Sequence, residues 1–498
     1  NGLKKWKEIQ ALIYGKYIKV AEIFPGFLEF AVQSKLRGSE LFIVSHKTKY
    51  GYYNTKKFFL RKASLNWLKF KNILGTKKKI IDKNHIFFET KKKDKIRRIK
   101  RLDCTHFIDD LKNVFFHNNF PKKTQKIFFS VNNEKFDLKN AKTFNTWRQI
   151  SKFFYSTWKC SEITKAVNIF FFKNQIIKSE IVKGRGNSQI FKLFSNKGKK
   201  YCLKIYPDKQ VDTRNRQDTE YKSTHYLSNR GFSVAKPVFK NKDLNWSIFR
   251  WEAGSKVTKV DNYFIDYSIN FIKKLKNNFS KINNLHFFSL ATEACLSGAE
   301  IENQIKNKQK ILQEQNNNKL KNFLNNNFNP SFNFFLNRAK NNMGRHFGQL
   351  LEKKYQILSP ADFGAHNGIK ISKKKIVFID FEYFGWDDPV RLIGDFYWHP
   401  GMNLHKDLKK KWLMTGYEIF RKDPLFNKRL TNHLPLLGLR WCLIILNEFI
   451  KDRLQKRIVA HKKKINKKLI LQKQFEKSKM LLIQINQLRQ TYNNGSTI

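Results

Sequence analysis

Hydrophobic and polar positions follow two different patterns in the first half of the chain. Two short apolar runs end in polar residues, LFIVSHKT (41–48) and CTHFIDDL (104–111), as buried parallel strands do. Between residues 168 and 252, the segments KSEIV, QIFKLFS, KKYCLKIY and WSIFRW alternate with turns, which predicts an antiparallel sheet. One helix, TRNRQDTEYKSTHYLSNRG, interrupts this sheet, and we expect Gly231 to end it.

The second half of the chain has a mainly helical pattern. Residues 256–358 are helix-like and rich in Asn and Lys, and the helical pattern resumes from 401 up to the polar tail YNNGSTI. The low-complexity segment NNNKLKNFLNNNFNP (316–330) is predicted to be a loop. WCLIILNEFI (441–450) is predicted to be a buried helix, because no apolar run approaches the ~20 residues that span a bilayer.

These patterns divide the 498 residues into an N-terminal α/β domain and an α+β remainder. We predict an α/β domain over 1–135, a helical connection over 136–167, an antiparallel-sheet lobe over 168–254 and a helical lobe over 255–498. The length agrees with the usual size of about 150 residues per domain.

The composition shows a large positive net charge and few cysteines. Lys and Arg number 99 against 39 acidic residues, a net charge of +60 that would attract nucleic acid or anionic membranes. The excess is mostly Lys, spread along the chain together with Phe, Asn and Ile, so a composition-driven solvated charge is favoured over a functional polyanion surface. Five scattered cysteines without a C-x-x-C pair indicate neither disulfides nor zinc, which suits the cytoplasm. Because the chain opens on Asn1, without a signal-peptide pattern, we expect its true N-terminus to be missing.

The stretch LSPADFGAHNGI (358–369) contains the tripeptide DFG, whose Asp binds magnesium in protein kinases. That role would require a catalytic Asp shortly upstream, but the nearest upstream aspartate is Asp266, in another segment. Downstream, Asp362 and Asn367 have the D-x-x-x-x-N spacing of a kinase catalytic loop. The other interpretation is that both are loop residues favoured by turn chemistry.

The residues after Asn367 complete this pattern. GIKI, SKKK and IVFID predict a strand, a turn and a strand, and such a hairpin would fold back to place Asp380 beside the loop. Phosphoryl transfer needs a carboxylate near the acceptor hydroxyl and oxygen ligands for magnesium. We therefore predict that Asp362 is the catalytic residue beside the acceptor hydroxyl and that Asn367 and Asp380 bind the metal.

A nucleotide cradle is predicted upstream, in KGRGNSQIFKL (183–193). Gly184 and Gly186 would let backbone N–H groups approach phosphates, and Ser188 adds a hydroxyl. Lys204 in the following strand is predicted to face the phosphates and to pair with Glu220 of the interrupting helix. For Glu220, a solvated charge on the helix face remains the alternative. These features follow one another in the order expected of a kinase-like phosphotransferase: the glycine loop, the Lys, the Glu, the D-x-x-x-x-N motif and the hairpin Asp.

Residues 168–498 resemble the aminoglycoside phosphotransferase and choline kinase superfamily, on LSPADFGAHNGI and on IVFIDFEYFGWDDPVRLIGDFYWHP (376–400). The resemblance implies a protein-kinase-like bilobal fold and the same roles for the site residues. Pro360 stands where the family usually has a His two residues before the catalytic Asp. Glu382 would touch a second metal or support the fold, and Asp388 before Pro389 is expected to cap a helix.

The function predicted from these residues is phosphorylation of a small hydroxylated metabolite such as a sugar, an amino alcohol or an aminoglycoside-like compound. ATP or GTP and Mg²⁺ are the expected cofactors. The partners are the nucleotide and the acceptor, with no specific nucleic acid and no transmembrane segment predicted. The sequence does not indicate the oligomeric state, and it leaves a catalytically weak pseudokinase that binds polyanions as an alternative.

The N-terminal portion resembles part of the haloacid dehalogenase (HAD) phosphatase superfamily, a Rossmannoid α/β fold. LFIVSHKT is similar to its second motif, in which Ser45 would bind phosphate. CTHFIDDL is similar to its last motif, in which Asp109 and Asp110 would hold magnesium, and Lys95 would take the third role. The nucleophilic D-x-D is not in the sequence, so this domain should lack phosphatase chemistry as it stands. A HAD-type phosphatase in the full-length protein is a further alternative.

Overall fold

The structure is a computed structural model that contains two compact units. The first unit comprises Asn1–Val182, Gln189–Thr213 and Phe239–Ile248, and the second comprises Lys183–Ser188, Arg214–Val238 and Phe249–Ile498. The described residues are 2–493 except 52–57, 75–79, 133, 135, 137, 139, 156, 172, 183–187, 208–211, 280–286, 452 and 454–465.

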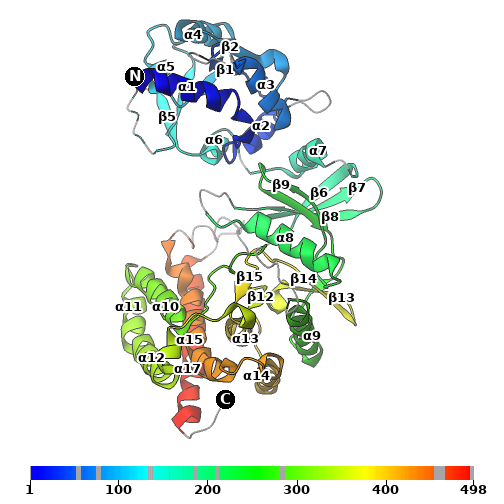
Figure 1. The fold of residues 1–498 in the computed structure, drawn as a ribbon, viewed down its shortest axis with the longest axis vertical. Coiled ribbons are helices and arrows are strands. Elements are labelled where there is room, and N and C mark those ends of the chain that lie inside the picture. Colours follow the sequence, from blue (N-terminus) through cyan, green and yellow to red (C-terminus); the bar gives the residue numbers. More distant parts are fainter. Residues whose placement is uncertain are drawn as a thin grey trace. The chain divides into compact units, whose positions relative to one another are not determined.

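Parallel strands organise the N-terminal part of the first unit, as the sequence predicted (Figure 1). β1 (Ile43–His46) pairs in parallel with β2 (Ile86–Glu89). A second parallel sheet has the order β3 (His106–Asp109), β4 (Gln125–Phe129), β5 (Ala141–Phe144). The accompanying helices are α1 (Gly2–Tyr14), α2 (Phe27–Leu36), α3 (Leu60–Phe70), α4 (Lys92–Arg101), α5 (Lys112–Phe115) and α6 (Trp147–Phe154). The next helix, α7 (Cys160–Phe170), packs against α2 and against β6 (Ile176–Val182).

The predicted antiparallel sheet is also present. Its order is β6-β7-β8-β10-β9, and β7 pairs in antiparallel fashion with both β6 and β8. Phe191 and Leu193 in β7 and Leu203 in β8 are buried, in agreement with the alternating pattern that predicted the sheet. The strands are β6 (Ile176–Val182), β7 (Gln189–Ser195), β8 (Lys200–Ile205), β9 (Pro237–Asn241) and β10 (Trp246–Arg250).

The second unit contains most of the helices. α8 (Arg216–Asn229) ends just before Gly231, whose φ of 70° suits the glycine predicted to terminate it. The long buried helix α15 packs against α10, α12, α13 and α17 (Figure 1). After α8, the described helices of this unit are α9 (Asn262–Phe279), α10 (Gly298–Gln313), α11 (Asn318–Phe323), α12 (Asn329–Met343), α13 (Pro389–Trp398), α14 (Lys406–Phe420), α15 (Phe426–Ile445) and α17 (Lys467–Asn493).

Short strands lie between some of these helices in the second unit. β12 (Ile357–Ser359) pairs with β15 (Gly385–Asp387), and the hairpin of β13 (Gly368–Ser372) and β14 (Lys375–Phe378) pairs with β11 (Ser255–Lys256). The segment 441–450, predicted as a buried helix, is the end of α15 and a 3₁₀ turn (Leu446–Phe449), in which Cys442, Leu443, Ile445 and Leu446 are buried and the other residues half-buried. Among the described residues, no helix has both the length and the apolar character needed to cross a membrane.

The prediction of a loop over 316–330 is wrong. This segment forms α11, a π-helical turn (Leu324–Phe328) and the start of α12. Leu320, Phe323, Leu324 and Phe328 are buried at spacings of three or four residues, so they form the apolar stripe of a helix, and most of the asparagines lie at exposed positions. The low-complexity composition concealed that stripe.

Acid stability should depend measurably on His433 of α15. Its side chain is buried against Phe347, and burial, followed by the charge of Arg429, lowers its pKa to about 3. Because the unfolded chain binds this proton at an ordinary pKa near 6.5, stability should fall as the pH drops from about 6.5 toward 3. We expect His433→Leu to reduce the decrease in Tm between pH 7 and pH 5. The exposed His405 provides the control, His405→Leu, and an equal decrease in all three proteins would contradict the prediction.

Candidate active site

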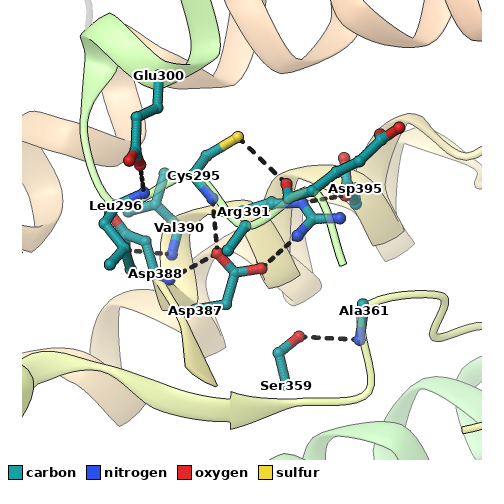
Figure 2. Close-up of polar contacts among 12 residues, drawn as sticks. Cys295, Leu296, Glu300, Ser359, Ala361, Asp387, Asp388, Val390, Arg391 and Asp395 are labelled. Carbon is teal, nitrogen blue, oxygen red and sulfur yellow. Dashed lines mark hydrogen bonds and ion pairs between the residues drawn. The ribbon is translucent and has the colours of Figure 1, made fainter. Parts of the chain in front are cut away.

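The loop that carries Asp362 is a tight turn fixed by β12. Ser359, the last residue of β12, accepts a hydrogen bond from the Ala361 N–H at 3.0 Å through its Oγ (Figure 2). Ala361 has a φ of 64°, an uncommon conformation for a residue with a side chain, and the Asp362 N–H donates to the Pro360 carbonyl at 2.8 Å. The Asp362 side chain is 33% exposed, whereas the neighbouring Ser359 and Phe363 are buried.

Asp362 and Asn367 lie together, as their spacing predicted. A short 3₁₀ helix (Ala365–Asn367) brings the Asn367 Nδ2 to 2.9 Å from the Asp362 backbone oxygen and 3.4 Å from its Oδ2. The His366 Nε2 lies 2.9 Å from the Asp362 Oδ1. Burial acts to raise the pKa of Asp362, but His366, with smaller contributions from His399 and Asn367, holds it below its ordinary value. An ionised carboxylate is thus available as a hydrogen-bond acceptor.

The predicted hairpin is confirmed. β13 and β14 are antiparallel, with Gly368 opposite Phe378, and the Ile379 N–H donates to the Asn367 carbonyl at 3.0 Å. Asp380 follows directly, with a φ of 68°. The chain therefore returns to the loop of Asp362 and Asn367 at the residue before Asp380. A metal shared by Asn367 and Asp380 stays a prediction.

Three carboxylates gather beside this loop. Oxygen atoms of Glu220, Asp380 and Glu382 lie within 4.8 Å of one another, and Glu382 also forms a buried ion pair with Arg216. Carboxylate oxygens are the ligands that Mg²⁺ prefers, so this group fits a divalent cation. Lys204 lies in the first unit, 7% exposed in β8, with its ammonium 5.0 Å from the Tyr206 ring centre, and its pairing with Glu220 stays a prediction.

Sequence reasoning missed two residues of this site. His366 belongs to the same short turn as Asp362 and Asn367, and its position one residue before the predicted metal ligand was the available signal. Arg216 stands four residues before Glu220, which places both on one face of α8. Its partner Glu382 lies far away in the sequence, so only the fold identifies the pair.

A buried ionic network links β15, which pairs with β12, to α13 (Figure 2). Arg391 of α13 contacts Asp387 Oδ2 through Nη1 at 2.5 Å and Asp395 Oδ2 through Nε at 3.1 Å. Asp387 also accepts the Cys295 N–H at 3.0 Å. The prediction that Asp388 caps a helix is confirmed, since its carboxylate accepts the Val390 N–H at the start of α13 at 2.8 Å.

The network continues into α15. Asp395 also contacts Arg440 Nη1 at 3.0 Å and accepts the Trp441 Nε1–H at 2.9 Å. Asp388 pairs with Arg429, which is bound to Asp423 as well. These contacts connect β15, α13 and α15.

The remaining predicted residues lie elsewhere. Gly184 and Gly186 fall outside the described residues, and Ser188 is half-buried just before β7. In the N-terminal part, the Lys95 ammonium is paired with the Asp109 carboxylate at 2.5 Å. Ser45 is half-buried in β1, and Asp110 is exposed after β3. Phosphate and magnesium binding by these four residues of the N-terminal part stay predictions.

No protein-family model and no curated protein matches the chain. Similar solved structures include the choline kinase LicA from Streptococcus pneumoniae, at 13% identity and a TM-score of 0.44 over 65% of this chain and 98% of that one. The spectinomycin phosphotransferase APH(9)-Ia with ADP and spectinomycin has 10% identity and a TM-score of 0.46 over 65% and 99%. The amicoumacin kinase hAmiN with AMP-PNP and Ca²⁺ has 15% identity and a TM-score of 0.43 over 68% and 99%. The function of this chain is therefore inferred from its own residues.

Proposed function

We propose that this protein is an ATP- and Mg²⁺-dependent phosphotransferase that phosphorylates a hydroxyl group of a small metabolite. The observation that carries the proposal is the meeting of Asp362 and Asn367 on one turn, with the β13–β14 hairpin returning the chain to that turn just before Asp380. A sugar, an amino alcohol or an aminoglycoside-like compound is the proposed acceptor class.

Asp362 is the proposed catalytic residue. Its carboxylate is ionised and one third exposed, so it can accept the proton of an incoming hydroxyl or orient that hydroxyl toward the phosphorus. The strained turn and the bonds from His366 and Asn367 hold it in one orientation. Most of the rate enhancement in such enzymes comes from positioning of this kind and from neutralisation of charge.

Asn367 and Asp380 are the proposed metal ligands, and Glu220 and Glu382 provide further carboxylate oxygens beside Asp380. A bound Mg²⁺ would neutralise the charge on the phosphate oxygens of the nucleotide. Arg216 balances Glu382, which limits the repulsion among three neighbouring carboxylates before a cation binds.

The nucleotide phosphates are assigned to the cradle predicted from the sequence. Lys204 would contact them, and Gly184, Gly186 and Ser188 would supply backbone and hydroxyl donors. Burial of Lys204 in β8, in contact with the Tyr206 ring, agrees with a defined orientation of its ammonium rather than a solvated surface position. ATP and GTP are both compatible with these groups.

The direct test is nucleotide consumption with a panel of hydroxylated acceptors. The protein is incubated with Mg²⁺ and ATP or GTP, together with sugars, amino alcohols or aminoglycosides, and the diphosphate product is measured. We expect formation of ADP or GDP that depends on one acceptor class. Metal-independent nucleotide binding, or tight salt-dependent RNA binding without any turnover, would instead favour the polyanion-binding pseudokinase.

The activity should depend on Mg²⁺, and Asp380 should be one of the residues that bind it. Excess EDTA is expected to abolish turnover and added Mg²⁺ to restore it. Because Asp380→Asn keeps the shape but removes a charged ligand, it should raise the Mg²⁺ concentration for half-maximal activity by about 10-fold or more. The control is Asp407→Asn, an exposed carboxylate at the start of α14. An unchanged Mg²⁺ dependence in Asp380→Asn would remove Asp380 from the metal site.

A further inference from the structure

The Asp362 carboxylate is held unequally at its two oxygens. Oδ1 lies 2.9 Å from the His366 Nε2, a normal hydrogen-bond length. Oδ2 lies 3.4 Å from the Asn367 Nδ2, which makes its shorter contact, at 2.9 Å, with the Asp362 backbone oxygen. Asn367 therefore fixes mainly the backbone of the turn, whereas His366 fixes the carboxylate itself.

His366 is itself held in place by a stack of rings. Its imidazole lies parallel to that of His399, with centroids 4.1 Å apart and an angle of 9°. The His399 ring meets Trp441 of α15 edge-on at 4.6 Å, and its Nδ1 accepts the Gly401 N–H at 3.0 Å. The Trp441 Nε1–H is bonded to Asp395. The orientation of His366 is thus fixed by its stack on His399, which Trp441 and Asp395 hold in turn.

The turn is also shaped to bring the backbone close to this ring. A Cβ atom at Gly364 would lie 3.0 Å from two atoms of the His366 ring and 2.8 Å from the Met402 Sδ. The next residue, Ala365, donates its N–H to the same sulfur at 3.1 Å. Any other residue at 364 would push His366 or Met402 away. The geometry of the His366 contact therefore depends on the glycine.

We propose that His366 is a positioning residue for Asp362, an inference that rests on the proposed function. Its Nε2–H occupies Oδ1 and prevents rotation of the carboxylate, so that Oδ2, whose contact among the described residues is the long one to Asn367, is the oxygen that meets the acceptor hydroxyl. His366 does not touch the reacting atoms. Its effect on the reaction passes entirely through Asp362, and a displacement of about 1 Å at such a group can lower a rate by about 100-fold.

Two substitutions separate this role from a packing role. The amide nitrogen of Gln can take the place of the His Nε2, whereas that of Asn corresponds to Nδ1 and falls short of Asp362. We expect His366→Asn to lower kcat about 10- to 100-fold with an unchanged KM for ATP. His366→Gln retains the donor and should lose only about 2- to 5-fold. Equal losses in both variants, or no loss in His366→Asn, would overturn the inference.

A double-mutant cycle with Asp362→Asn gives a second, independent readout. Because His366 acts through the carboxylate, His366→Asn should cause little further loss, less than about 3-fold, once the carboxylate is gone. The full 10- to 100-fold loss in the Asp362→Asn background would contradict the inference. All proteins are assayed at a temperature at which circular dichroism shows each of them folded. An inactive parent protein would refute the proposed function and this inference together, whereas an active parent with additive variants would refute the inference alone.

Discussion

Replacing Asp362 with asparagine is expected to lower the rate of phosphoryl transfer by about 100- to 10,000-fold. The amide keeps the shape of the side chain and can still accept the His366 N–H, but it cannot take up the proton of the acceptor hydroxyl. Nucleotide binding should be unchanged, since Asp362 is assigned to the acceptor rather than to the phosphates. The measurements are product formation at saturating ATP and Mg²⁺, and the Kd for ATP by calorimetry.

The matched control for this prediction is Asp407→Asn, the same chemical change at a carboxylate that is 89% exposed. It should retain the full rate. Turnover of Asp362→Asn within a few-fold of the parent protein would remove Asp362 from the mechanism. A parallel loss of ATP affinity would instead place Asp362 among the nucleotide ligands, contrary to the assignment of the metal site to Asn367 and Asp380.

The largest effect on stability is expected from Arg391→Met. The guanidinium of Arg391 lies between Asp387 and Asp395, and all three side chains are less than 10% exposed. Burial raises the pKa of Asp387 even though Arg391 acts to lower it, so removal of the cation leaves a buried carboxylate poorly compensated. Breaking a buried pair in this way typically costs about 3–5 kcal/mol. Chemical denaturation should show this loss in the free energy of unfolding.

Lys306→Met is the control for the buried pair. Lys306 is 58% exposed and pairs with Glu302, which keeps a second contact with Lys340. A pair of this kind in a helix contributes about 0.3–0.5 kcal/mol. Similar losses in both variants would show that the buried network of β15, α13 and α15 is not a special source of stability.

The predictions that the structure confirmed depend on residues close together in the sequence. The D-x-x-x-x-N spacing placed Asp362 and Asn367 on one turn, and the apolar alternation after it produced the β13–β14 hairpin. The cap formed by Asp388 and the end of α8 near Gly231 were equally local. Turn chemistry, hydrogen bonds between adjacent strands and helix capping act within a few residues, so the sequence alone specifies them.

Other features could not be predicted because their partners are remote. Glu220 was predicted as a partner for Lys204 or as a solvated charge on the helix face, and neither interpretation anticipated its place beside Asp380 and Glu382, some 160 residues further along. In a chain with 99 basic residues, no pattern singles out Arg216 as the one that binds Glu382. The segment 316–330, predicted to be a loop, is helical because its apolar residues pack on one face against other buried residues.

The sequence by itself determined the parallel strands of the N-terminal part, the antiparallel sheet after residue 168 and the short turn that carries the candidate catalytic carboxylate. Only the tertiary structure decided which charges meet around that turn: the three carboxylates with Arg216, and the buried arginines of α13 and α15. The physical reason is that a buried charge must find a compensating charge in three dimensions, and packing of distant elements, rather than local preference, selects the partner.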